Sequence, residues 1–286
     1  MGSHEFLGPP ELQARDLYLD LMKRCLTNWM YGHTELQPFR HPRRVPRKML
    51  ASLSARWLAP HGAQIVTVSG YDPAVRAEGR DWSPVAHTMI GLKRLDHLQR
   101  CLEGVLANHV PGDVIETGVW RGGATIFMRA VLAAYGVQDR AVWVADSFEG
   151  LPPPNATRYP KDAGDLHHTN KELAVPLETV QANFERYGLL DGQVRFLKGW
   201  FRDTLPTAPI DRLAVIRLDG DMYESTMDGL VHLYPKLSLG GYLIVDDYGS
   251  NVPCRQAVED FRASHGIREA LLRIDWAGVC WQRTQA

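Results

Sequence analysis

The sequence predicts an α/β fold of the Rossmann-like type, with a helical N-terminal extension before a seven-stranded sheet whose last strand is antiparallel. Two observations predict this fold. Beyond Gly112, short apolar segments alternate with helical patterns, as they do in a parallel sheet flanked by helices. Near the C-terminus, two strand-like segments follow each other across the tight turn Trp276–Gly278, which reverses the direction of the last strand.

Two helices are expected before the sheet. Apolar residues recur at helical spacing between Glu11 and Met30 and again between Thr88 and Ala107. Residues 37–50 combine basic residues with prolines, which is typical of a solvated loop and also suits a mobile lid. We therefore expect residues 11–80 to form an extension that includes a lid, and residues 81–286 to form the main domain. Residues 1–10, which open with Met-Gly-Ser-His, are typical of a vector-derived tail.

The elements of the sheet follow in chain order. The expected strands are residues 114–117, 141–145, 194–198, 213–218, 242–245, 270–274 and 279–283. The expected helices between them are residues 123–135, 177–187, 225–237 and 254–265. The connection 152–169, which contains His167 and His168, is long for a compact domain and is a second candidate for a lid.

Charge and composition argue against several classes of protein. The 286 residues include 32 Lys and Arg against 33 Asp and Glu, so the chain lacks the basic excess of a nucleic-acid or membrane binder. No apolar run reaches the roughly 18 residues that a membrane span needs, and the N-terminus lacks the basic-then-apolar pattern of a secretory signal, so we expect a cytoplasmic location. None of the cysteines forms a C-x-x-C pair or has a histidine at zinc-binding spacing, so we expect reduced, mostly structural thiols. The cysteines are Cys25, Cys101, Cys254 and Cys280.

A glycine-rich turn, Glu116-Thr-Gly118-Val-Trp-Arg-Gly-Gly, follows the first expected strand. Such a turn lets the backbone approach a ligand closely, although it can also simply connect a strand to a helix. The next strand ends in Asp146, which is suitably placed to accept hydrogen bonds from a ribose diol. The glycine spacing departs from the dinucleotide pattern G-x-G-x-x-G, and an acid before the turn suits a cofactor with a positively charged amino group. A nucleoside cofactor, S-adenosylmethionine being the common one, is therefore expected.

Two further apolar strands end in acids, in Leu-Asp219-Gly-Asp221 and Val-Asp246-Asp247. Parallel strands joined by a helix end at the same edge of a sheet, so Asp219, Asp246 and Asp247 should converge there. Clustered carboxylates repel one another unless a cation intervenes, and an all-oxygen ligand set suits Mg²⁺. The alternative is that these acids cap helices or are solvated. For Asp221 the favoured interpretation is the N-cap of the helix that follows.

Other functions fit these motifs less well. An aspartyl-phosphate phosphatase usually carries Asp-x-Asp on its first strand, whereas here this motif follows the fourth expected strand. A glycosyltransferase would not need Asp246 and Asp247. A nicotinamide-dependent oxidoreductase is disfavoured by the glycine spacing and by the reversed last strand. A binding protein without catalysis would not need three converging aspartates.

Several blocks of sequence, agreeing in order and spacing, resemble the macrocin/mycinamicin sugar O-methyltransferase family of antibiotic biosynthesis. The resemblance covers about residues 80–283 and implies the class I methyltransferase fold. The blocks are Ala86-His-Thr-Met-Ile-Gly, Glu116-Thr-Gly-Val-Trp-Arg-Gly-Gly, Val144-Ala-Asp-Ser-Phe-Glu-Gly, Tyr187-Gly-Leu-Leu-Asp, Leu218-Asp-Gly-Asp-Met-Tyr and Val245-Asp-Asp-Tyr.

The resemblance also implies roles for single residues. In the turn, the methionine part of the cofactor would be held by Glu116, Gly118, Val119 and Trp120, and a segment before the sheet, Thr88 and Met89, would close over it. The end of the second strand, Asp146 and Ser147, would take the ribose. The adenine would lie near the end of the third strand, at Gly199 and Trp200. Asp219, Asp246 and Asp247 would bind Mg²⁺, and Asp219 would also receive the hydroxyl proton.

The expected function is Mg²⁺-dependent methylation, from S-adenosylmethionine, of a deoxysugar hydroxyl on a macrolide or aminocoumarin antibiotic. The alternative is a catechol-type O-methyltransferase that acts on an aromatic diol. A homodimer with a small glycoside as acceptor, and with neither nucleic acid nor membrane as partner, is expected. Tyr31, His33 and Glu35, at the end of the first helix, are hypothetical contacts of the acceptor.

Overall fold

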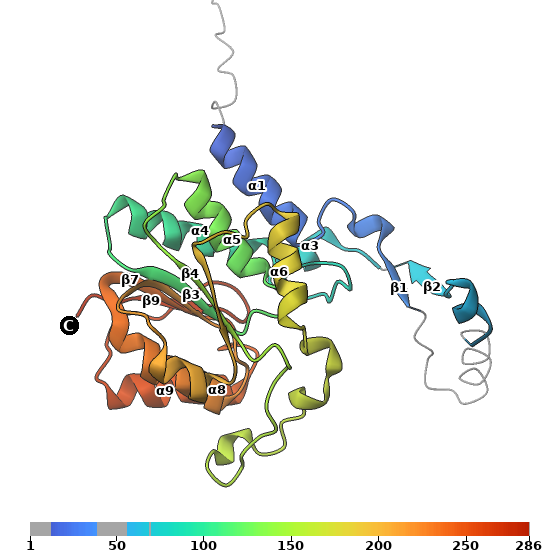
Figure 1. Cartoon of the computed structure of the whole chain (residues 1–286). Coiled ribbons are helices and arrows are strands. Elements are labelled where there is room, and N and C mark those ends of the chain that lie inside the picture. The colour runs from blue at the N-terminus through green and yellow to red at the C-terminus, as the bar shows by residue number, and fades with distance from the viewer. Residues whose placement is uncertain (1–12, 39–55, 69, 286) are drawn as a thin grey trace, which may run out of the picture.

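The computed structural model describes residues 13–38, 56–68 and 70–285. A central sheet lies between two layers of helices (Figure 1). The tail predicted for residues 1–10 and most of the basic run at 37–50 lie outside the described residues.

The sheet has seven strands in the order β5-β4-β3-β6-β7-β9-β8. The strands from β3 to β7 pair in parallel and β9 runs antiparallel to both of its neighbours, which confirms the predicted topology. The chain winds from β3 outward to β5 and then returns to start β6 on the other side of β3, so a crevice opens beyond the carboxyl ends of β3 and β6. The strands are β3 (Asp113–Thr117), β4 (Val142–Asp146), β5 (Val194–Lys198), β6 (Leu213–Leu218), β7 (Leu237–Val245), β8 (Leu272–Arg273) and β9 (Val279–Gln282).

Alternate residues of each inner strand face the two helical layers, as the two-residue period of a strand requires. Val114 and Val144 pack in one core, and Ile115 and Ala145 pack in the other. The first layer contains α1 (Ala14–Leu26), α4 (Leu92–Ala107), α5 (Gly123–Ala134) and α6 (Leu177–Arg186). The second contains α8 (Tyr223–Leu233) and α9 (Val252–Ser264). The short helices α3 (Pro73–Ala77) and α7 (Phe201–Thr204) lie in connections.

Three helix boundaries differ by four residues from the sequence prediction. The first helix ends at Leu26 rather than Met30, because Asn28 adopts a left-handed conformation with φ 52°. The second begins at Leu92 rather than Thr88. The helix expected at 225–237 ends at Leu233, where a 3₁₀ turn containing Pro235 follows, and β7 begins at Leu237.

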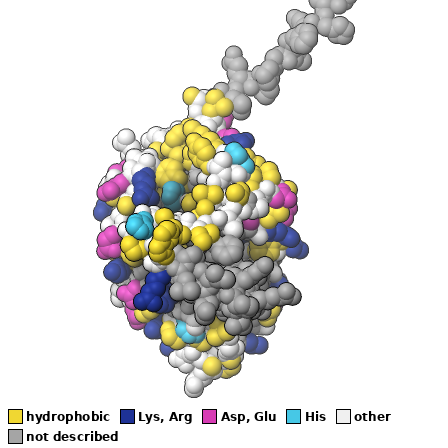
Figure 2. Space-filling view, turned by 90° about the vertical axis from the view of Figure 1, so that its right-hand side faces the viewer, with side chains coloured by type: hydrophobic (Ala, Val, Ile, Leu, Met, Phe, Trp, Pro, Cys, Tyr) yellow, Lys and Arg dark blue, Asp and Glu magenta, His cyan; other side chains and the backbone are white. Residues whose placement is uncertain are grey.

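The N-terminal extension is helical only in part. After α1, the strands β1 (Leu36–Pro38) and β2 (Val66–Val68) pair antiparallel and project away from the sheet (Figure 1). Figure 2 views this side of the molecule and shows hydrophobic side chains on its surface; Trp57 and Val68 are among the most exposed apolar residues. No helix of the described residues is long and apolar enough to cross a membrane.

Candidate active site

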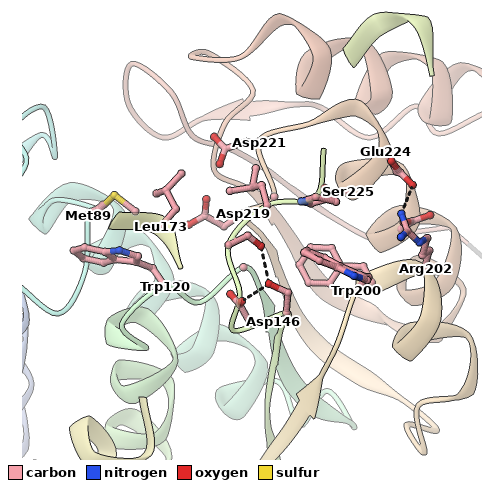
Figure 3. Close-up of a pocket in the computed structure, with 18 residues that line it drawn as sticks. Met89, Trp120, Asp146, Leu173, Trp200, Arg202, Asp219, Asp221, Glu224 and Ser225 are labelled. Carbon is pink, nitrogen blue, oxygen red and sulfur yellow. Dashed lines mark hydrogen bonds and ion pairs between the residues drawn. The ribbon is translucent and has the colours of Figure 1, made fainter. Parts of the chain in front are cut away.

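A pocket opens at the carboxyl ends of the central strands (Figure 3), with about 710 Å³ of empty space that includes solvent at its open side. Met89, Trp120 and Leu173 form one end, and Trp200 and Arg202 lie at the other. Asp146 and Asp219 line the wall between these ends. Gly118 and Ser147 also line it, so the pocket collects seven of the residues predicted from the sequence. The pocket therefore has an aromatic side chain at each end and carboxylates between them.

The glycine turn after β3 is packed directly on the end of β6. Gly118 has φ 82°, and a Cβ at this position would lie 1.6 Å from the backbone oxygen of Asp219. Only glycine fits here, because both the left-handed conformation and the lack of space exclude a side chain. Trp120 also has a positive φ of 49°, and its indole Nε1 donates to the backbone oxygen of Glu172 at 2.8 Å. The turn therefore fixes Trp120 in the pocket wall.

Asp146 organises the end of β4. Its Oδ2 accepts from the backbone N–H of Val119 at 2.8 Å, and its Oδ1 accepts from that of Phe148 at 2.7 Å. Burial raises the pKa of Asp146, and these hydrogen bonds oppose the increase. The hydroxyl of Ser147 donates to the backbone oxygen of Gly150 at 2.6 Å, so it shapes the turn that follows. The carboxylate of Asp146 keeps further acceptor capacity for a ligand in the pocket.

A fully buried guanidinium lies beneath the pocket. Nη1 of Arg217, in β6, donates to Glu116 and, at 2.8 Å, to Oδ2 of Asp219, while Nη2 donates to Oδ1 of Asp246 at 2.5 Å. Arg94 of α4 donates to the other oxygen of Asp246. Glu116 also accepts from the hydroxyl of Thr125 and is 2% exposed, so its oxygens are engaged below the turn. Burial raises the pKa of Glu116 to about 7 although Arg217 opposes the increase.

Asp219, Asp246 and Asp247 lie together, with one oxygen of each within 4.8 Å of the others. Burial raises the pKa of Asp219, and it raises that of Asp247 well above the usual range, with further contributions from neighbouring carboxylates. The connected network also includes Glu116 and the Asp275 partner of Arg94. Its five carboxylates face two guanidiniums, which leaves three negative charges uncompensated when all are ionised.

Asp221 does not cap α8, so the favoured sequence interpretation is wrong. Asp162, from the long connection after β4, accepts from the N–H groups of Tyr223 at 2.7 Å and Glu224 at 3.0 Å. Asp221 instead lines the pocket, has φ 60°, and accepts from Asn251 at 2.6 Å. Burial, followed by the charge of Asp219, raises its pKa to about 6.

Four residues predicted to touch the cofactor lie just outside the pocket lining. Glu116 is below the turn, and Val119 contributes the backbone bond to Asp146. Thr88 is buried, with its hydroxyl oxygen accepting from Ile90. Gly199 donates its N–H to the backbone oxygen of Asp146 at 2.9 Å. These four residues support the walls that their neighbours line.

Glu35 is likewise committed elsewhere. It is 3% exposed, and its Oε2 accepts from Asn28 at 2.9 Å, Arg76 at 3.2 Å and Ser83 at 2.8 Å. It lies outside the pocket lining and anchors the start of the N-terminal hairpin, so the structure does not support the hypothesis that it contacts the acceptor. Tyr31 is largely exposed.

Sequence reasoning assigned no role to Arg94, Asp162 or Arg217. For two of them a signal existed: Arg217 is a lone charge within an apolar strand, and Arg94 falls on the apolar face of α4 with Leu98 and Cys101. Buried charges of this kind are paired. No local signal marks Asp162, because its partners are some sixty residues away in the chain.

The strand order, the glycine turn at the switch point and the acid that ends the next strand define a class I methyltransferase. The family model "Macrocin-O-methyltransferase (TylF)" matches residues 15–283, and the chain belongs to this family. It is an S-adenosylmethionine-dependent O-methyltransferase.

Two relatives match nearly the whole chain. The 8-demethyl-8-(2,3-dimethoxy-alpha-L-rhamnosyl)-tetracenomycin-C 4'-O-methyltransferase of Streptomyces olivaceus is 55% identical over 274 residues, covering 96% of this chain and 95% of the relative. The mycinamicin III 3''-O-methyltransferase of Micromonospora griseorubida is 50% identical over 273 residues, covering 94% and 97%. The solved structure of the O-methyltransferase NovP has a TM-score of 0.81 and 50% identity, covering 95% of this chain and 100% of that one.

Proposed function

We propose that this protein methylates a hydroxyl of a deoxysugar on a glycosylated antibiotic, using S-adenosylmethionine and a Mg²⁺ ion held by Asp219, Asp246 and Asp247. The observation that carries the proposal is the convergence of these three carboxylates beside a pocket with aromatic ends. One close relative is named for a rhamnosyl group, which is a deoxysugar, and another for mycinamicin III.

We propose that S-adenosylmethionine lies along this pocket, between its two ends. Met89 and Trp120 would surround the methionine part, Asp146 would accept the ribose hydroxyls, and Trp200 would stack on the adenine. Glu116 is bonded to Arg217 and Thr125, so we propose that it positions Arg217, and that the turn backbone at Gly118 contacts the cofactor. Thr88, Val119, Ser147 and Gly199 would hold these walls in place.

The carboxylate cluster also fits a hard divalent cation. Its donors are all oxygens, and its uncompensated negative charge would be largely neutralised by one Mg²⁺. Arg94 and Arg217 bond both oxygens of Asp246, and each oxygen retains a further lone pair for a metal. When bound, Mg²⁺ would make the sugar hydroxyl more acidic and orient it.

The side chains of the pocket would then perform the remaining tasks. Asp219 would receive the hydroxyl proton, while Arg217 holds its Oδ2 in place. Asp221 lines the same pocket and is the second carboxylate that can take this role. Trp120, Leu173 and Trp200 would exclude water while the hydroxyl is held behind the methyl group.

The direct test is methyl transfer from labelled S-adenosylmethionine to a panel of acceptors. The panel contains a rhamnosylated aromatic polyketide, a deoxysugar macrolide, an aminocoumarin glycoside and a catechol, each assayed with Mg²⁺ and with a chelator. Labelling of a glycoside that disappears when the chelator is added supports the proposal, whereas labelling of the catechol alone would support the alternative. Asp219→Asn, which alters a proposed metal ligand that is also the proposed base, should lose both Mg²⁺ binding and turnover. Asp221→Asn should keep both; an Asp221→Asn variant that binds Mg²⁺ but does not turn over would assign the base to Asp221.

The homodimer also belongs to the proposal. Leu17 and Leu21 on α1 are about half exposed, and burial of these side chains would favour a second subunit on this helix. Light scattering of wild type and Leu17→Glu/Leu21→Glu tests the dimer: a mass halved only in the variant supports it, and a monomeric wild type excludes it.

A further inference from the structure

A second group of metal-binding side chains lies between α4 and β9. Among the described residues, only two groups of three or more His, Cys, Asp or Glu side chains have ligand atoms within 4.8 Å of one another. One is the aspartate cluster, and the other consists of His97, Cys101 and Cys280. None of these three lines the pocket, so this group is separate from the proposed methyl-transfer chemistry.

The chain brings the three side chains together from two distant segments. His97 and Cys101 are one turn apart on the same face of α4, as residues at positions i and i+4 must be. Cys280 is in β9, where it pairs with Ile244 of β7. The third ligand is thus supplied only by the fold, which explains why cysteine spacing along the sequence predicted no zinc site.

The donor set and its geometry suit a soft, tetrahedral cation. His97 Nδ1 lies 3.6 Å from Cys101 Sγ. A tetrahedral zinc ion with bonds of about 2.1 Å to nitrogen and about 2.3 Å to sulfur holds these two atoms about 3.6 Å apart. Both thiols are almost fully buried, whereas His97 is half-buried and leaves a route for the ion from solvent.

We propose that His97, Cys101 and Cys280 form a Zn²⁺ site, with a water molecule as the fourth ligand. Binding would join two thiolates and one neutral imidazole to the ion, and the two thiol protons would pass to the solvent. The ion would clamp α4 to β9. Arg94, three residues before His97 on the same helix, bonds Asp246 and Asp275, so the clamp would also steady the position of this arginine.

Co²⁺ is the probe for this site, since thiolate ligands give it a charge-transfer absorption in the near ultraviolet that carboxylates do not. The metal-free, reduced protein is titrated with Co²⁺ in the presence of excess Mg²⁺, which occupies the aspartate cluster, and Zn²⁺ is then added to displace the cobalt. Cys101→Ser and Cys280→Ser test the thiol ligands, and His97→Gln tests the imidazole at a half-buried position. Cys254→Ser, another buried thiol in the second core, is the matched control.

The proposal expects one equivalent of Co²⁺ with thiolate absorption, complete displacement by Zn²⁺, and wild-type behaviour of Cys254→Ser. Either serine variant should lose the absorption, and His97→Gln should weaken binding by at least about tenfold. If the wild type shows no thiolate absorption and Ellman's reagent still counts four thiols after unfolding, the site is overturned in favour of a hydrogen-bonded thiol pair. Two missing thiols in protein purified without reductant and metal would overturn it in favour of a disulfide.

Discussion

Replacing Arg217 with Met is expected to destabilise the protein strongly. Methionine has a similar length and no charge, so the change leaves Glu116, Asp219 and Asp246 without their shared guanidinium. Breaking one buried ion pair by removing a partner costs about 3 to 5 kcal/mol. At roughly 2 to 4 °C per kcal/mol for a chain of this size, the melting temperature should fall by about 10 °C.

Glu116 is expected to account for much of this loss. In the wild type its pKa is already raised by burial to about 7, even with Arg217 opposing the increase. Without Arg217 the folded-state pKa rises further, so the folded protein retains a proton that the unfolded chain releases. Stability should therefore fall as the pH rises, and the gap between variant and wild type should be larger near about pH 8 than near about pH 6.

Scanning calorimetry at both pH values, with three variants, measures these effects. Glu116→Gln in the Arg217→Met background should restore part of the lost stability, because a neutral amide replaces the unpaired carboxylate. Arg195→Met, which removes an exposed arginine from the edge strand β5, should change stability by less than about 0.5 kcal/mol. An Arg217→Met melting temperature within about 2 °C of the wild type would refute this reasoning.

Three further predictions concern the turn, the long connection and pH. Gly118→Ala should abolish cofactor binding measured by calorimetry, because its Cβ would meet the Asp219 backbone; Gly136→Ala, with φ 66° but open space around it, should cost only about 1 kcal/mol and bind normally. Asp162→Ala should cost about 1 to 2 kcal/mol in urea unfolding, since α8 loses its N-terminal acceptor; an unchanged midpoint would argue against the cap. Burial and two nearby arginines lower the pKa of His87 below 6.5, so its contribution to stability is complete above that pH and is lost as the pH falls through it; urea unfolding should show this decline in wild type and a weaker one in His87→Gln.

The sheet was predictable because its signals are local and repeated. Each strand is a short apolar run, each is followed by a helical pattern, and the chain order then determines which strand ends share an edge. The same logic predicted that Asp219 and Asp246 would meet. The hairpin of β1 and β2 was not predictable in this way, because two three-residue strands about thirty residues apart leave almost no periodic signal.

The site was predictable only as far as motifs reach. The motifs placed Gly118, Asp146 and Trp200 at the pocket, but they did not show that one oxygen of Glu116 accepts from Arg217 and the other from Thr125. The N-terminus of α8 illustrates the limit: Asp221 is near it in sequence, whereas Asp162 arrives from the long connection and supplies the cap. Pairings between distant segments require the folded arrangement.

Calorimetric titration of Mg²⁺ into protein saturated with S-adenosylhomocysteine tests the central claim, that the carboxylates at the ends of β6 and β7 hold the cation. The wild type should bind one equivalent. Asp247→Asn should weaken binding by at least about tenfold, because it removes one ligand and leaves the Arg217 bonds intact. Asp228→Asn, which alters a pocket carboxylate outside the cluster, should bind as the wild type does. Equal Mg²⁺ affinity in wild type and Asp247→Asn, or no binding to the wild type, would contradict the account.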